Sequence, residues 1–311
     1  MRPASFACQV EFIILKLQDH YTLIFIEMKY FFVICILLSS VFTGNAQWST
    51  TPIKTETINL TSTLNKRTYK ISVALPSSYN KENTYPVYYI LDGYYAFPIA
   101  SESMKALKMG KEIKDFILVS IAGDETNDYE WLVNRWSDYT FTQIIKNDTS
   151  FTKSWNIKSP GLISGGGETF YKIITNEIIP LIDSRYSTSN ERGISGHSLS
   201  GLYVANILLK GDGVFTKFGI NSPSFIMWAN DILQAENNYA QTHTSLNAKV
   251  FFSIGELENA ADVSNLVKFE SLLKKYIGLN STLVIFKDET HTSVGPAMIS
   301  RTMKVLYSKK E

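Results

Sequence analysis

Short apolar runs alternate with segments of helical periodicity along residues 47–311. Polar–apolar alternation predicts an antiparallel strand at 66–75, and the next predicted strands lie at 86–91, 116–121, 192–195, 218–220, 249–254 and 283–286. Helical spacing predicts helices at 97–109, 170–181, 199–209, 263–276 and 294–307. Strands that alternate with helices form right-handed crossovers. The pattern therefore predicts a single α/β domain at 47–311, with a mostly parallel sheet covered by helices on both faces.

One long segment, residues 124–168, interrupts this alternation. It is loop-like and rich in Asn, Asp, Ser and Thr, and it ends in three consecutive glycines. It also carries several large aromatic residues, which disordered segments avoid. We expect an ordered excursion that packs over the sheet edge. Its aromatic residues either line a pocket for aryl groups or pack the excursion onto the core.

The first 46 residues have the features of a leader. From Met28 the chain has a basic start, a short apolar run and a small-residue ending at Ala46, the three parts of a secretory signal. We expect the signal peptide to span about 28–46 and the mature protein to begin at Gln47, in the periplasm or outside the cell. A membrane anchor is the alternative, but the apolar run is shorter than the ~20 residues that a span requires.

Composition narrows the class of protein. The chain has 311 residues, of which 45% are hydrophobic, enough for a large core. Its formal net charge is +1 without a concentrated basic run, so we expect no nucleic-acid partner. Both cysteines, Cys8 and Cys35, lie in the expected leader, and the mature protein therefore needs no disulfide.

The most informative stretch is residues 192–202, which predicts the end of a strand, a tight turn and the start of a helix. Ser198 stands at the apex of the turn, with Gly196 two positions before it. This is close to the G-x-S-x-G nucleophile elbow, in which a strained turn exposes a serine hydroxyl. Ser200 occupies the position where glycine is usual, and Gly201 follows it. Ser198 is therefore the candidate nucleophile.

The candidate base is found by elimination among four histidines. His20 lies in the leader, His197 is adjacent to Ser198, and His243 precedes the strand that should carry the acid. His291 remains, directly after the last predicted strand. A neutral imidazole there would accept the Ser198 proton and return it to the leaving group.

The acid should follow the strand at 249–254, because nucleophile-elbow hydrolases place Ser, acid and His in this order. Glu256, Glu258 and Asp262 all qualify. Glu258 lies three residues after the turn glycine Gly255, and we favour it, with Glu256 as the second choice.

The oxyanion hole requires two preorganised backbone N–H groups. Leu199 should supply one, at the start of the helix after Ser198. The turn at Asp92-Gly93 should supply the other through Tyr94, because glycine permits a tight turn there. No metal or organic cofactor is needed for this chemistry.

Several segments together resemble the putative esterase family of α/β-hydrolases, particularly its enterochelin and bacillibactin esterase-like members, and also feruloyl and acetyl-xylan esterases. The matching segments are Tyr89-Ile90-Leu91-Asp92-Gly93, Gly165-Gly166-Gly167 with Phe170, Gly196-His197-Ser198-Leu199-Ser200-Gly201, Ser222-Pro223-Ser224 with Trp228, Gly255-Glu256-Leu257-Glu258, and Thr290-His291. The resemblance implies an α/β-hydrolase fold and a serine esterase.

We therefore expect an exported carboxylic-ester hydrolase acting on a small-molecule ester such as a siderophore, or on a polysaccharide-linked acetyl or feruloyl ester. An acyltransferase and a non-catalytic binding protein are the alternatives. Arg135 would meet an anionic substrate, and Trp136 and Trp228 are the candidate aromatic contacts. No stable membrane span is expected in the mature form.

Overall fold

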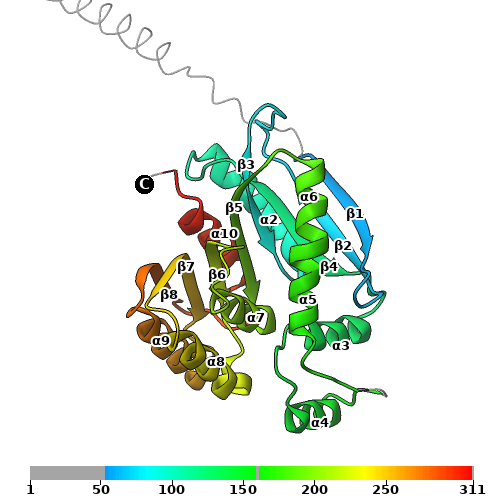
Figure 1. Ribbon diagram of the computed structural model, residues 1–311, viewed down its shortest axis with the longest axis vertical. Coiled ribbons are helices and arrows are strands. Elements are labelled where there is room, and N and C mark those ends of the chain that lie inside the picture. The colour runs from blue at the N-terminus through cyan, green and yellow to red at the C-terminus, as the bar shows by residue number, and fades with distance from the viewer. Residues whose placement is uncertain (1–52, 159–160, 310–311) are drawn as a thin grey trace, which may run out of the picture. The chain divides into compact units, whose positions relative to one another are not determined.

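The computed structural model describes residues 53–158 and 161–309, and the centre of this part of the chain is an eight-stranded sheet (Figure 1). Its strands are β1 (Thr55–Thr61), β2 (Thr68–Ala74), β3 (Tyr85–Ile90), β4 (Ile117–Gly123), β5 (Thr188–His197), β6 (Lys217–Asn221), β7 (Ser245–Gly255) and β8 (Ile277–Phe286). Their order across the sheet is β1-β2-β4-β3-β5-β6-β7-β8. Only the β1–β2 and β2–β4 pairs are antiparallel. The predicted mostly parallel sheet is confirmed.

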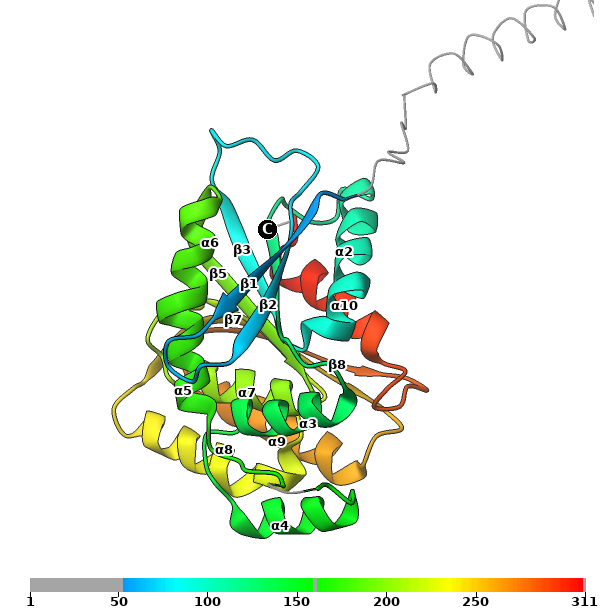
Figure 2. The same cartoon turned by 90° about the vertical axis from the view of Figure 1, so that its right-hand side faces the viewer.

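Helices cover both faces of the sheet, as predicted. The helices α2 (Gly93–Met109) and α10 (Gly295–Leu306) lie on one face (Figure 2). The other face carries the continuous helix formed by α5 (Gly167–Ile173), η1 (Ile174–Ile178) and α6 (Ile179–Arg185), together with α7 (Leu199–Leu208), α8 (Phe225–Ala240) and α9 (Ala260–Leu273).

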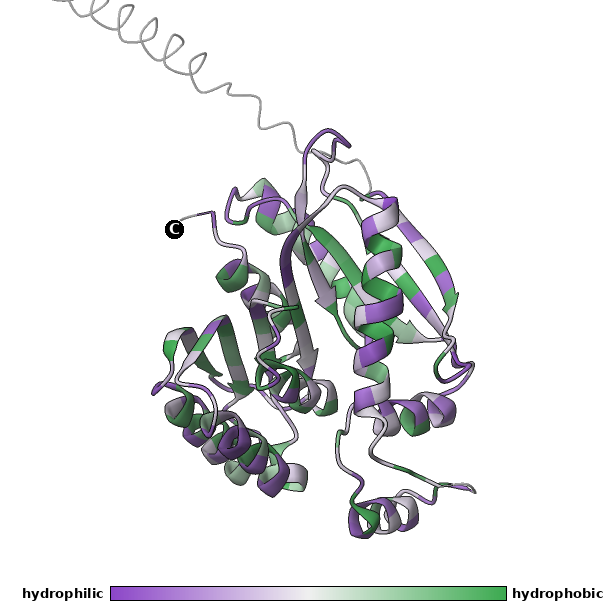
Figure 3. Ribbon diagram, in the orientation of Figure 1, coloured by the Kyte–Doolittle hydropathy of each residue, from purple (hydrophilic) through white to green (hydrophobic). Residues whose placement is uncertain are grey.

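The side chains of β3 show why helices must pack on both faces of the sheet. Tyr88 and Ile90 are buried with α2 and α10, whereas Val87 and Tyr89 are buried in the larger core on the opposite face. Successive side chains of a strand point to opposite faces, so a strand that is apolar throughout must be covered on both. Figure 3 shows the complementary pattern on the helices, since the outward surfaces of α8 and α9 are mainly hydrophilic.

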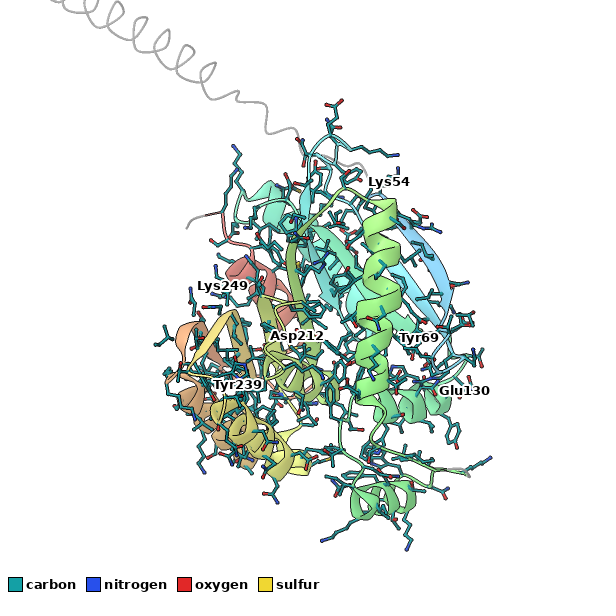
Figure 4. All side chains as sticks on the ribbon, viewed as in Figure 1. Lys54, Tyr69, Glu130, Asp212, Tyr239 and Lys249 are labelled. Carbon is teal, nitrogen blue, oxygen red and sulfur yellow. The ribbon has the colours of Figure 1, made fainter. Side chains whose placement is uncertain are left out.

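The described part of segment 124–168 contains two helices where the sequence predicts only loop, and that expectation is corrected here. It contains α3 (Asp128–Asp138) and α4 (Ile145–Ser154). The side chain of Asn127 caps α3 by accepting the backbone N–H of Glu130, which Figure 4 labels. A polar cap and acidic residues in the first turn stabilise a helix that has little apolar periodicity.

Aromatic contacts join this excursion to the rest of the fold. The Trp136 ring, which is buried, contacts Phe151 and Trp155 around α4, and it contacts Trp228 of α8 at a centroid distance of 5.2 Å. The excursion is therefore held by a shared aromatic core between α3, α4 and α8.

The structure contains two further elements that the sequence pattern does not predict, and several elements begin earlier than predicted. Strand β1 was not predicted, because Ile58 is its one buried residue and apolar alternation is weak. Helix α8 was also not predicted, and its backbone is non-helical at Trp228. Strand β8 begins at Ile277, six residues before the predicted start.

Two expectations concern the chain outside this fold or its relation to membranes. The expected leader at 1–46 lies outside the described residues. Within 53–158 and 161–309, no helix combines the length and the apolar character needed to cross a membrane.

Candidate active site

Ser198 occupies the turn between β5 and α7. Its backbone has φ 63° and ψ −120°, a strained conformation for a residue with a side chain. A Cβ atom at Gly196 would lie 2.4 Å from the Ser200 carbonyl carbon, and one at Gly201 would lie 2.6 Å from the Asn221 oxygen. Helix and strand therefore approach so closely that only glycine fits at these two positions, which is the geometry expected of a nucleophile elbow.

The loop after β6 supports this turn. The backbone N–H of Ser198 donates to the backbone carbonyl of Asn221 at 3.1 Å, and the backbone N–H of Ser224 donates to the backbone carbonyl of Ser198 at 3.1 Å. The Ser198 and Ser224 hydroxyl oxygens are 3.2 Å apart. Sequence reasoning singled out Ser222-Pro223-Ser224 as a family marker without assigning it a contact, and the structure shows that it lies against the elbow.

His291 and Glu258 form a hydrogen-bonded pair from the loops after β8 and β7. The His291 Nδ1 atom lies 2.6 Å from Glu258 Oε2. The other oxygen of Glu258 accepts the Ser222 hydroxyl at 2.6 Å and the Gly255 N–H at 2.7 Å. Burial raises the pKa of the Glu258 carboxyl, but these hydrogen bonds and the His291 imidazole outweigh burial and hold the pKa below its usual range.

The other two candidate carboxylates face elsewhere. Glu256 accepts the Asp288 N–H at 3.1 Å, and Asp262 accepts the Ile226 N–H at 2.9 Å. Of the three candidates, Glu258 is the one whose side chain contacts His291, and only 4% of that side chain is exposed.

The two candidate oxyanion donors lie at the starts of helices that follow the adjacent strands β3 and β5. Tyr94 is in the first turn of α2 after β3, and Leu199 begins α7 after β5. The backbone N–H of Leu91 donates to the backbone carbonyl of Ser195 at 3.0 Å, and this bond aligns the carboxyl ends of β3 and β5. The first N–H groups of a helix have no partner within the helix, so these two turns can present donors to a bound anion.

The three predicted substrate contacts have largely buried side chains, and that of Arg135 is 11% exposed. Arg135 makes a bidentate ion pair with Asp92, with Nε 2.7 Å and Nη2 2.9 Å from the two carboxylate oxygens. Trp136 donates its indole N–H to Asp148 at 2.8 Å, and its ring packs against Trp228. Trp136 and Trp228 are 1% and 2% exposed, so both belong to the core rather than to a substrate surface.

A cleft of about 580 Å³ lies beside the Tyr94 turn, between α2, α3 and the edge strands. Tyr94, Phe97 and Trp131 supply its aromatic surface, and Lys70 and Asp128 supply charged groups. Its volume lies within the range of clefts that bind small molecules. The two alternatives for the aromatic residues of the excursion apply to different residues, because Trp131 lines this cleft whereas Trp136 packs into the core.

Comparison with known proteins identifies the family of the chain. The family model described as "Putative esterase" matches residues 61–276. The ferri-bacillibactin esterase BesA of Bacillus subtilis is 26% identical over an alignment of 265 positions that covers 80% of this chain and 88% of the relative.

Solved structures share the fold. The BES protein from Bacillus cereus superposes with a TM-score of 0.70 at 23% identity, over 81% of this chain and 94% of that one. An IroE-like serine hydrolase from Shewanella oneidensis gives a TM-score of 0.69 at 24% identity, over 82% and 80% of the two chains. The eight-stranded sheet therefore has the α/β-hydrolase fold. Because the family match covers more than half of the sequence, the chain belongs to the putative esterase family, a family of carboxylic ester hydrolases.

Proposed function

We propose that this carboxylic ester hydrolase is an exported serine esterase whose nucleophile is Ser198, whose base is His291 and whose acid is Glu258. The observation that carries the proposal is the 2.6 Å contact between His291 Nδ1 and Glu258 Oε2, at the sheet edge where Ser198 occupies a strained turn. A buried carboxylate on Nδ1 leaves Nε2 of a neutral imidazole free to act as an acceptor.

The reaction proceeds in two half-reactions. Ser198 Oγ attacks the ester carbonyl while His291 Nε2 takes its proton, and the carbonyl oxygen becomes an oxyanion that the Tyr94 and Leu199 N–H groups stabilise. Collapse of this intermediate breaks the ester C–O bond, and His291 returns the proton to the departing alkoxide. Water then attacks the acyl-enzyme by the same route, which releases the acid and restores the Ser198 hydroxyl. Glu258 keeps the imidazole oriented and stabilises its charged form.

His197 is a second histidine beside the site, and we do not assign it the role of base. Its ring stacks near the His291 ring with centroids 4.5 Å apart, and its Nδ1 lies 3.4 Å from the Tyr95 hydroxyl. Burial lowers the pKa of His197 to about 4, and the nearby charges of His291 and Arg135 act in the same direction. An imidazole with so low a pKa is a weak proton acceptor at neutral pH.

We propose a siderophore-type ester with aryl groups as the substrate. The support is the name of the ferri-bacillibactin esterase to which the chain is similar, together with the aromatic surface of Tyr94, Phe97 and Trp131 in the cleft beside the oxyanion turn. His291 has a side chain that is 47% exposed, which suits a bulky ester that approaches an open site.

The first prediction concerns the proposed triad. Ser198→Ala and His291→Ala should each reduce kcat for p-nitrophenyl acetate by several orders of magnitude, because members of a triad act as a unit. Glu258→Gln should reduce kcat less strongly. Glu256→Gln is the matched control, since its carboxylate faces Asp288, and it should retain wild-type kcat. Unchanged turnover in Ser198→Ala would refute Ser198 as the nucleophile. No turnover by the wild type together with no labelling of Ser198 by a fluorophosphonate would instead support a non-catalytic binding protein.

The second prediction concerns acid stability. His197 binds a proton in the unfolded chain below about pH 6.5, but in the folded protein only near pH 4, so the free energy of unfolding should decrease as pH falls through this window. The decrease is at most ~1.4 kcal/mol per pH unit. Urea denaturation at pH 6.5 and 4.5 should show a smaller decrease for His197→Asn than for wild type. His243→Asn replaces an exposed histidine and should keep the wild-type decrease; equal decreases in all three proteins would contradict the prediction.

The third prediction concerns the substrate. A triscatecholate trilactone should be hydrolysed with a higher kcat/KM than methyl ferulate or acetylated xylan. Trp131→Ala should raise KM for the trilactone, while the KM for p-nitrophenyl acetate, which is too small to fill the cleft, stays within about twofold. Preference for the xylan would support a carbohydrate esterase. Product analysis with added alcohols distinguishes hydrolysis from acyl transfer.

The fourth prediction concerns export. When the full chain is produced in a bacterium with a secretion pathway, mass spectrometry of the exported protein should find Gln47 at its N-terminus. Ala46→Arg removes the small residue that cleavage requires and should leave the leader attached. A wild-type product that keeps residues 28–46 would refute the proposed signal peptide.

A further inference from the structure

A buried carboxylate stands directly before one of the two proposed oxyanion donors. Asp92 follows β3, has φ 54° and ψ 42°, and precedes Gly93 and Tyr94 at the start of α2. Its side chain is 1% exposed. The chain turns sharply here in a conformation that a residue with a Cβ atom rarely adopts, so other contacts must hold the turn in place.

Those contacts come from two other segments of the chain. Arg135 of α3 donates to both carboxylate oxygens, at 2.7 and 2.9 Å. The Ser200 hydroxyl of α7 donates to Asp92 Oδ2 at 2.7 Å. The backbone N–H of Asp92 donates to the Tyr139 hydroxyl at 3.1 Å. Both oxygens of the buried charge are thus hydrogen-bonded, as a carboxylate removed from water requires.

The same groups hold the second turn, at the nucleophile. The His197 N–H donates to the Ser200 hydroxyl oxygen at 2.8 Å, and Arg135 Nη2 donates to the His197 carbonyl oxygen at 3.1 Å. Both backbone groups of the residue that precedes Ser198 are therefore bound by residues that also bind Asp92.

The network accounts for the departure of the elbow from its usual pattern. Ser200 is fully buried at the position where glycine is usual. Its hydroxyl oxygen accepts the His197 N–H of the nucleophile turn, and its hydroxyl group donates to the Asp92 carboxylate of the other turn. A glycine there would leave the His197 N–H and one Asp92 lone pair without this partner.

We propose that Asp92, Arg135 and Ser200 form a positioning network that fixes the Asp92–Tyr94 turn relative to the Ser198 turn, and so sets the spacing of the two oxyanion donors. The inference rests on the proposed function, since it concerns the oxyanion hole of that site. The three residues act through the backbone and do not touch the substrate. Their effect should appear in transition-state stabilisation, because misplacing a donor by a fraction of an ångström weakens its bond to the oxyanion more than it weakens substrate binding.

The test is the kinetics of Ser200→Ala and Ser200→Gly in the full chain, with p-nitrophenyl acetate. Each variant removes the hydroxyl bridge but keeps the Asp92–Arg135 ion pair. We expect kcat to fall by about tenfold to a hundredfold while KM changes by less than about twofold, since a lost oxyanion donor alone costs ~10²–10³ in kcat. A kcat within twofold of wild type would overturn the proposal.

A double-mutant cycle separates positioning from packing. Asp92→Asn should reduce kcat at least as much as Ser200→Ala, and the double variant should be no slower than Asp92→Asn alone, because both changes break the same bridge. Additive losses would contradict a shared network. Should Asp92→Asn fail to fold, Arg135→Lys replaces it in the cycle, because a lysine cannot reproduce the bidentate contact.

Glu236→Gln is the matched control. Glu236 of α8 is a buried carboxylate, 1% exposed, that accepts the Tyr276 hydroxyl at 2.7 Å and pairs with Lys275 at 2.6 Å, and both partners follow the end of α9. Its replacement should lower the denaturation midpoint without changing kcat of the folded protein. Equal losses of kcat in Glu236→Gln and Ser200→Ala would overturn the proposal.

Failure of this inference can be told apart from failure of the proposed function. An active Ser198→Ala variant would refute the nucleophile itself. An inactive Ser198→Ala variant together with a fully active Ser200→Ala variant would refute only the positioning network.

Discussion

The ion pair between Asp92 and Arg135 is the contact on which the arrangement of the site depends. It joins the end of β3 to α3, and Ser200 extends it to the start of α7. These segments are far apart in the sequence and follow three strands, β4, β3 and β5, that are consecutive in the sheet. A buried charge is costly unless it is fully paired, and this requirement makes the geometry specific.

Because Arg135 is paired with Asp92, its positive charge is already balanced by a residue of the protein. The Nε and Nη2 groups of the Arg135 guanidinium are bonded to the buried Asp92 carboxylate and are not available to a ligand. Trp136 is committed in the same way, because its indole N–H is bonded to Asp148 and its ring lies in the aromatic core of the excursion. The surface left beside the oxyanion turn is a cleft of aromatic and mixed-charge character, lined by Tyr94, Phe97 and Trp131.

The backbone around the proposed nucleophile Ser198 is closely packed, whereas the side chain of the proposed base His291 is half exposed. Close packing at Gly196 and Gly201 brings α7 against β5 and β6, and hydrogen bonds from the loop after β6 hold the Ser198 backbone. Glu258 is buried and fully bonded, whereas the His291 side chain is 47% exposed. Hydrogen bonds thus hold the Ser198 backbone and the Glu258 carboxylate in place, while the His291 imidazole stays half exposed.

The sequence by itself determined the fold class and the identity of most candidate groups. Apolar runs separated by helical segments predict the parallel sheet, since burial on both faces requires strands of this composition. Short-range steric demands also appear directly in sequence, as glycines around Ser198. The order of the chain after Ser198 further reduced the candidates for the base to His291 and those for the acid to three carboxylates.

Only the tertiary structure decided which of these side chains meet. Glu256 and Glu258 are two residues apart in one loop, and the hydrogen bonds of Gly255 and Ser222 select Glu258 as the partner of His291. The positions of Arg135 and Ser200 depend on a carboxylate more than forty residues from either. The sequence alone does not show whether a polar side chain faces solvent or a buried partner. The free energy that favours the buried position comes from contacts between segments that are distant in the sequence.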